Sequence, residues 1–161
     1  MHISRLEVHQ VRNLKQVAID LHSAANVVYG INGSGKTSFL EALHLLGRGK
    51  SFRHRDLRLV INHDASDLIV SAKVERQSPP RTHQLGVKRT RNGHFMARMD
   101  GENLQSAVQL AAIIPLQLID AHSFNLLEGG PLQRRQFLDW GVFHVEPSYT
   151  DLWRRFQKTL K

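Results

Sequence analysis

Eight residues from Gly30 to Thr37 combine the residue types that bind a chain of phosphates. They read Gly-Ile-Asn-Gly-Ser-Gly-Lys-Thr, which is the pattern G-x-x-x-x-G-K-[ST]. Glycines let backbone N–H groups converge on an anion, and a helix that follows directs its positive end at the same point. The lysine reaches the β- and γ-phosphates in this pattern, and the threonine hydroxyl is a ligand of Mg²⁺. The spacing therefore predicts a phosphate-binding loop (P-loop) for ATP or GTP with Mg²⁺.

The segments on either side of the loop favour the same interpretation. Residues 26–29, before the loop, read as a short apolar strand, and residues 37–46, after it, read as a helix that ends at Gly47. A strand before the motif and a helix after it form the context that this chemistry requires. The predicted nucleotide contacts come from Gly30, Ile31, Asn32, Gly33, Ser34, Gly35, Lys36, Thr37 and Ser38, with Thr37 also the metal ligand.

Composition limits the class of protein. A chain of 161 residues, 41% of them hydrophobic, suffices for one domain with a core or for a small two-lobed unit. No apolar run approaches the length that spans a bilayer, and residues 1–5 lack the apolar stretch of a secretory signal. The absence of cysteine excludes disulfides, thiolate metal sites and cysteine nucleophiles. We expect a cytoplasmic protein that does not associate with a membrane.

The chain is strongly basic, with a formal net charge of +8 and a pI of about 10.4. A charge of this sign suits nucleic acid, although it also suits solubility or an acidic protein partner. A cluster of cations with one aromatic residue, Phe52, follows the predicted P-loop helix. We expect it to contact DNA phosphates, and the alternative is an ordinary solvated loop. Its cations are Arg48, Lys50, Arg53, Arg55 and Arg58.

Hydrophobic patterning predicts an α/β protein. Residues 3–11 alternate as a half-buried strand, 17–21 form a second strand, and these two precede the P-loop strand in a mixed sheet. An antiparallel β-subdomain of about 68–99 follows, with a hairpin signalled by Asn92-Gly93. Further on we expect a helix at 103–110, a buried strand at 113–119, and helices at 124–127, 131–140 and 149–161. The predicted domains are a lobe at 1–148 and the start of an arm helix at 149–161.

Two segments superficially match other ATPase motifs. Residues 118–120, Leu-Ile-Asp, resemble a Walker B strand, but Pro115 and Gln117 interrupt the apolar run and Ala121 stands where the catalytic acid belongs. Residues 127–131 resemble an ABC signature but carry Glu128 in place of its serine. We reject both, so no convincing base activates water and we expect little hydrolysis. The ten histidines show no metal-ligand spacing.

Several strings together resemble the RecF family of DNA replication and repair proteins over the whole chain. They are Val11-Arg12-Asn13-Leu14, the P-loop, Leu40-Glu41-Ala42-Leu43 and Gly49-Lys50-Ser51-Phe52-Arg53. The most specific is Gly-Gly-Pro-x-x-Arg-Arg-x-Phe-Leu-Asp at 129–139. One departure is Ala121-His122, where the family usually has Pro-Glu, so a nucleotide-sensing role for that acid does not carry over.

The resemblance implies an ABC-type, SMC-like ATPase head that is incomplete in a chain of this length. Such a head binds ATP with Mg²⁺, forms an ATP-dependent homodimer, and binds single-stranded DNA and gapped duplex. The family works with RecO and RecR to load RecA, and it takes part in the SOS response. In ABC-type heads the residues after the first strand lie beside the phosphates, so Arg12 and Asn13 join the predicted pocket, with a solvent-exposed Arg12 as the alternative.

Two other functions compete with this one. The first is a basic DNA-binding or adaptor fragment that carries a P-loop without turning nucleotide over. The second is a P-loop enzyme of kinase type that is complete in itself, and it requires a Walker B strand that the sequence does not supply. Nucleotide affinity and hydrolysis, measured with and without DNA, separate the three.

Overall fold

The computed structural model describes residues 1–146 and 148–159, with the backbone alone at residue 122. These residues form two compact units, Met1–Leu116 and a second that starts at Gln117. The sequence instead places its boundary after residue 148, and the assignment of 149–161 to an arm helix stays a prediction. The side chain of His122 lies outside the described residues, as do Leu160 and Lys161 at the end of that helix.

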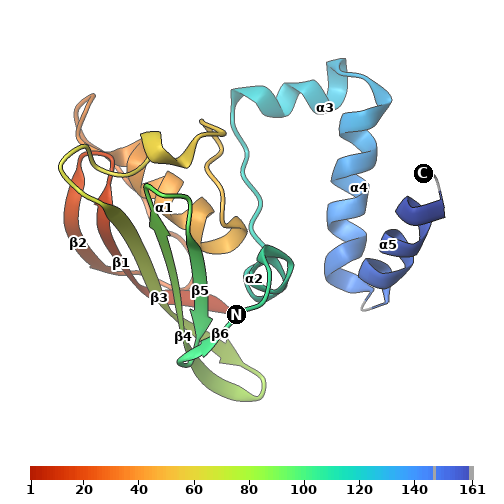
Figure 1. Ribbon diagram of the computed structural model, residues 1–161, viewed down its shortest axis with the longest axis horizontal. Coiled ribbons are helices and arrows are strands. Elements are labelled where there is room, and N and C mark those ends of the chain that lie inside the picture. Colours follow the sequence, from red (N-terminus) through yellow and green to blue (C-terminus); the bar gives the residue numbers. More distant parts are fainter. Residues whose placement is uncertain (147, 160–161) are drawn as a thin grey trace. The chain divides into compact units, whose positions relative to one another are not determined.

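A six-stranded antiparallel sheet forms the framework of the first unit (Figure 1). Its order is β2-β1-β3-β4-β5-β6. The two leading strands and the predicted β-subdomain belong to this one sheet, because β1 pairs directly with β3. The strands are β1 (His2–Val11), β2 (Leu14–Asp20), β3 (Asp67–Gln77), β4 (Pro80–Thr90), β5 (Phe95–Met99) and β6 (Glu102–Asn103).

Alternation of side chains explains why only one face of the sheet is buried. In an antiparallel ladder, directly opposed residues lie on the same face, so apolar residues at matching positions form rows across the strands. One row joins Val8, Val70, Val87 and Ala97, each buried and each paired with the next. On β1 and β3, the residues that alternate with the buried ones are mostly polar and face outward. This alternation fixes the register of the two strands.

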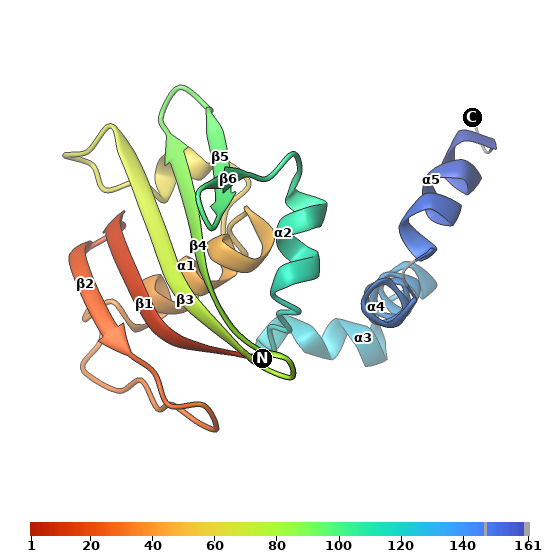
Figure 2. The same ribbon diagram turned by 90° about the horizontal axis from the view of Figure 1, so that it is seen from below.

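Two helices complete the core of this unit (Figure 2). Helix α1 (Lys36–Arg48) packs across β1, β3 and β4, and α2 (Ala107–Ile113) packs beside α1. Helix α1 ends where Gly49 takes a φ of 65°, a left-handed value that glycine adopts without cost. The packing of the helix therefore fixes its N-terminus, where the P-loop ends, relative to the sheet.

The second unit is helical. It contains η2 (Ala121–Phe124), α3 (Asn125–Glu128), α4 (Pro131–Val145) and α5 (Tyr149–Thr159). Pro131 stands in the first turn of α4, as predicted. The Tyr149 hydroxyl donates to Asp139 Oδ1 at 2.6 Å, and that bond raises the pKa of Tyr149 to about 12. No helix within the described residues combines the length and apolarity needed to cross a bilayer.

The predicted strand at 26–29 is wrong. These residues have no strand partner among the described residues, and Val27 and Tyr29 are 84% and 89% exposed. Their apolar pattern is that of a central buried strand, but a strand forms only where another lies beside it.

The predictions around residue 110 also need correction. The structure places β6 at Glu102–Asn103 and α2 at Ala107–Ile113, where we expected one helix at 103–110. The segment expected as a buried strand, 113–119, is the end of α2 followed by extended coil, and Ile119 is 82% exposed. Pro115 explains part of this difference, because a proline cannot donate to a central ladder.

Candidate nucleotide-binding site

The P-loop connects the exposed segment 26–29 to the first turn of α1. Gly30, Gly33 and Gly35 take φ values of 148°, 83° and 100°, which only glycine adopts readily. Lys36 Nζ donates to the carbonyl oxygens of Gly30 and Ile31, both at 2.8 Å, so the ammonium lies over the loop. Gly35 has no side chain with which to cap α1, and the first N–H groups of the helix therefore stay available to an anion.

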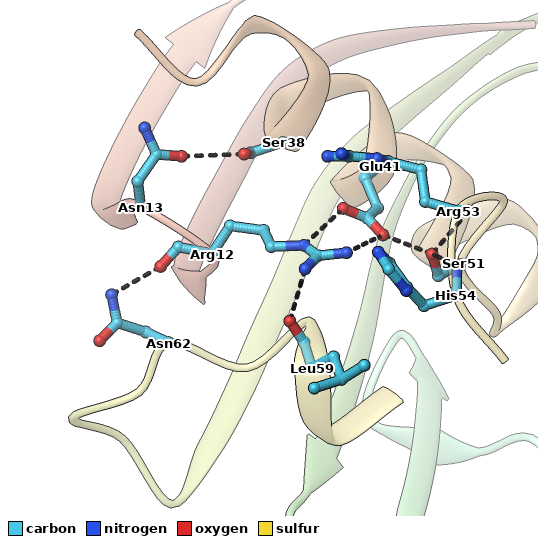
Figure 3. Close-up of polar contacts among 9 residues, drawn as sticks. All are labelled: Arg12, Asn13, Ser38, Glu41, Ser51, Arg53, His54, Leu59 and Asn62. Atoms are coloured by element: carbon cyan, nitrogen blue, oxygen red, sulfur yellow. Dashed lines mark hydrogen bonds and ion pairs between the residues drawn. The ribbon is translucent and has the colours of Figure 1, made fainter. Parts of the chain in front are cut away.

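Asn13, in the two-residue turn between β1 and β2, links the turn to the loop. Its Nδ2 donates to the Gly33 carbonyl at 2.8 Å, and its Oδ1 accepts from the Ser38 hydroxyl at 2.8 Å (Figure 3 shows the second bond). Ser38 is buried and its hydroxyl is directed to Asn13. Thr37, by contrast, is exposed beside it, where a hydroxyl can reach a metal ion. Of the two residues after β1, Asn13 is the one whose side chain contacts the P-loop.

Gly35→Ala should destabilise the fold more than Gly33→Ala, a change of the same kind in the same loop. A Cβ at Gly35 would lie 2.6 Å from Leu14 Cδ2 and 3.3 Å from Asn13 Nδ2, at a φ of 100°. Gly33 has a φ of 83° and nothing within 4 Å, so Gly33→Ala carries only the backbone cost of about 1–2 kcal/mol. We expect a clearly lower melting temperature for Gly35→Ala than for Gly33→Ala without nucleotide. Equal melting temperatures would contradict the close packing of the turn on the loop.

Arg12 makes a different set of contacts. Its Nε and Nη2 donate to the two carboxylate oxygens of Glu41 at 2.9 and 3.1 Å, and its Nη1 donates to the Leu59 carbonyl at 2.7 Å (Figure 3). The Arg12 side chain is 20% exposed and that of Glu41 is not exposed at all. The solvent-exposed alternative for Arg12 is therefore excluded. Its guanidinium is held by α1 and the 57–62 segment, and a contact with nucleotide phosphates stays a prediction.

The backbone at Arg12 supports this arrangement. Arg12 has a φ of 56°, uncommon for a residue with a Cβ. Its N–H donates to the Val60 carbonyl at 2.8 Å, and its own carbonyl accepts from Asn62 Nδ2 at 2.6 Å. Such a conformation persists where the surroundings determine it from several sides, and it occurs often at functional sites.

Glu41 is the buried charge of this region. Burial by itself raises the pKa of its carboxyl, but hydrogen bonds from Arg12 and Ser51 and the positive charges of Arg12 and Arg53 outweigh it, so the pKa is lowered. Glu41 therefore stays ionised at neutral pH. Sequence reasoning missed its role, although an acid between the apolar Leu40 and Ala42 in the middle of a helix was a signal that it needs a partner.

Ser51 extends this network into the basic segment. Its hydroxyl donates to Glu41, and its oxygen accepts from the N–H groups of Arg53 and His54 at 3.0 Å each. Nearby, His44 Nδ1 donates to the Lys50 carbonyl at 2.6 Å, because that carbonyl can only accept. The contacts of Glu41 with Arg12 and Ser51 thus join three elements: the β1–β2 turn, α1, and the loop at 50–56.

The five cations predicted to bind DNA do not form one surface. Arg48 is half-buried, and its Nη2 donates to the Leu116 carbonyl at 3.4 Å; burial lowers its pKa. Arg58 forms a two-pronged ion pair with Asp56, with its shortest contact at 2.8 Å. Lys50, Arg53, Arg55 and Arg58 are exposed, and of these four Arg58 has its charge paired with Asp56. Whether these residues bind DNA stays a prediction.

Comparison with known proteins identifies the same class that the geometry defines. The model of the RecF/RecN/SMC N-terminal domain matches residues 2–130. A solved structure of the recombination mediator RecF with ATP superimposes with a TM-score of 0.83 at 24% identity, covering 99% of this chain and 42% of that one. A solved SMC ATPase gives a TM-score of 0.72 at 17% identity, covering 87% of this chain and 99% of that one. The fold is that of a P-loop ATPase head of SMC type, which confirms the predicted fold class.

The chain belongs to the RecF/RecN/SMC N-terminal domain family. It is 52% identical over all 161 residues to the DNA replication and repair protein RecF of Pseudomonas syringae pv. tomato and to that of Pseudomonas entomophila. It spans 44% of the length of each of these relatives. The resemblance to RecF drawn from the sequence is confirmed.

Proposed function

We propose that this chain is the nucleotide-binding lobe of a RecF-like protein and that it binds ATP with Mg²⁺ at Gly30–Thr37. The observation that carries the proposal is the loop itself. Three glycines with positive φ, the Lys36 ammonium bonded to the loop carbonyls and the uncapped first turn of α1 all belong to this one short segment. Thr37 would supply a hydroxyl to Mg²⁺, and the metal would offset phosphate charge.

The wider role follows from the relatives. Proteins 52% identical to this chain are named DNA replication and repair proteins, and a structural neighbour is described as a recombination mediator with ATP. We propose that the longer protein binds single-stranded and gapped duplex DNA, dimerises on ATP and acts in the cytoplasm with RecO and RecR to load RecA during the SOS response. The charge of +8 supports the DNA-binding part of this proposal.

The chain should bind MgATP in a saturable manner and hydrolyse it barely, if at all. Lys36 and Thr37 supply the binding groups, whereas the described residues near the loop include no carboxylate placed to activate water, since Glu41 is held by Arg12. Isothermal titration with MgATP and a steady-state phosphate-release assay measure the two properties. Turnover at an ordinary enzymatic rate of about 1 s⁻¹ or more would contradict this prediction.

The second candidate function, a DNA-binding or adaptor fragment with an idle P-loop, has one observation in its favour. Val27 and Tyr29 before the loop and Ile31 within it are largely exposed, so the N-terminal side of the loop has no packing support within the described residues. The same titration separates the two functions. Salt-sensitive DNA binding without any saturable binding of MgATP would favour the second.

A further inference from the structure

A basic cavity lies where β4 turns into β5, apart from the P-loop. Its volume is about 310 Å³. Two stretches far apart in sequence build it: the segment after α1, including η1 (Leu57–Leu59), and the Asn92-Gly93 hairpin turn. Four arginines and a single carboxylate line it: Arg55, Arg58, Arg89, Arg91 and Asp56.

Arg91 is fixed in place by backbone carbonyls. Its Nε donates to Ala65 at 2.7 Å, and its Nη2 donates to Asn62 at 2.8 Å and to His63 at 3.1 Å. Carbonyl oxygens satisfy the N–H groups of a guanidinium without cancelling its charge, because they are neutral acceptors. Arg91 therefore contributes a full positive charge at a fixed position.

The other three arginines differ in how far their charge is compensated. Arg58 is paired with Asp56, and this pair accounts for the one carboxylate of the cavity. Arg55 and Arg89 form no ion pair with any residue that the structure describes; Arg89 lies over the Phe95 ring, 5.4 Å from its centroid. The lining thus carries three charges, on Arg55, Arg89 and Arg91, that no lining carboxylate offsets.

The chemistry of the lining selects a phosphate group. Guanidinium groups bind phosphate oxygens in two-pronged geometry and are weakly hydrated, which suits them to this anion. Leu57, the one apolar lining residue, is buried, so the wall offers no apolar or aromatic surface for a base. The charged groups of this wall therefore match phosphate oxygens, which a nucleic-acid backbone presents along its length.

We propose that this cavity holds a backbone phosphate of DNA and gives a contact that does not depend on sequence. The inference rests on the DNA-binding part of the proposed function and adds the site. Sequence reasoning found two of its arginines, Arg55 and Arg58, but assigned them to a cluster with residues that lie elsewhere. It missed Arg89 and Arg91, although the run Lys88-Arg89-Thr90-Arg91 before a hairpin turn was visible.

The test compares two double variants that each remove two arginines. Arg55→Ala/Arg89→Ala takes the two cavity arginines that make no ion pair and leaves the structural Arg91 in place. The control, Arg76→Ala/Arg81→Ala, takes an exposed pair opposed across β3 and β4 at the other end of β4. Binding to a gapped duplex is measured against salt concentration. We expect the cavity variant to bind more weakly, with a log–log salt slope flatter by about 0.9, and the control to keep the wild-type slope.

Each outcome decides the proposal. An unchanged salt slope in the cavity variant would overturn the proposal. An equal loss of DNA affinity in the cavity variant and the control would also overturn it, because it would show that DNA responds to the surface charge as a whole. Melting temperatures of the free proteins check folding, and Arg55→Lys/Arg89→Lys, which keeps both charges, should retain the slope. A wild type that binds MgATP but no DNA would refute this inference together with the DNA-binding part of the proposed function.

Discussion

Lys36→Ala should abolish the rise in melting temperature that MgATP gives the wild type. A ligand present at 100 times its dissociation constant stabilises the folded state by about 2.7 kcal/mol. For a chain of this size that amounts to a shift of roughly 5–10 °C. The ammonium lies at the loop, where Nζ is 2.8 Å from the Gly30 and Ile31 carbonyls. Its removal takes away the lysine charge that would contact the β- and γ-phosphates.

The free protein provides the control for this prediction. The two bonds of Lys36 are to exposed carbonyls, so Lys36→Ala should change the melting temperature without nucleotide by little. Lys73→Ala removes an exposed lysine from β3 and should keep the full shift with MgATP. A Lys36→Ala protein that retains the MgATP shift would show that nucleotide binds elsewhere, and the assignment of the P-loop would fail.

The sequence predicts local features of this fold better than features that depend on a partner. The glycine pattern of the P-loop, the alternation of β1 and the Asn92-Gly93 turn are determined within a few residues, and the structure has all three. The strand expected at 26–29 depends on a neighbouring strand that is not among the described residues. An apolar run reports that a segment can be buried, and only the rest of the fold decides whether it is.

The same distinction explains the site. The roles of Lys36, Thr37 and the glycines can be predicted from the sequence, because they belong to one short motif whose spacing places them around a phosphate. The partnership of Arg12 with Glu41 joins residues 29 positions apart, and periodicity carries no information about such pairs. From the sequence we expected Arg12 to lie beside the nucleotide phosphates. In the structure its guanidinium instead pairs with the Glu41 carboxylate of α1, at 2.9 Å.

Glu41→Ala should be among the most destabilising single substitutions in the first unit. It leaves the guanidinium of Arg12 in a largely buried place with the Leu59 carbonyl as its remaining side-chain bond, and it frees the Ser51 hydroxyl. Removing one partner of a buried ion pair costs about 3–5 kcal/mol, and the lower end applies because Arg12 is 20% exposed. Chemical denaturation measures the free energy of unfolding. Glu102→Ala, at an exposed carboxylate on β6, should change it by less than about 0.5 kcal/mol.

A double-mutant cycle and the pH dependence identify the cause of that loss. Arg12→Ala/Glu41→Ala removes both charges, so its loss should be smaller than the sum of the two single losses by about 1–3 kcal/mol. The folded-state pKa of Glu41 is lowered, so the stabilisation by its charge is complete above the unfolded value of about 4.3 and is lost as the pH falls through the folded value. The difference in stability between wild type and Glu41→Gln should therefore shrink as the pH falls below about 4. Additive losses in the cycle, with a difference that does not vary with pH, would mean that Glu41 acts by packing alone and that the Arg12–Glu41 ion pair does not hold the turn to α1.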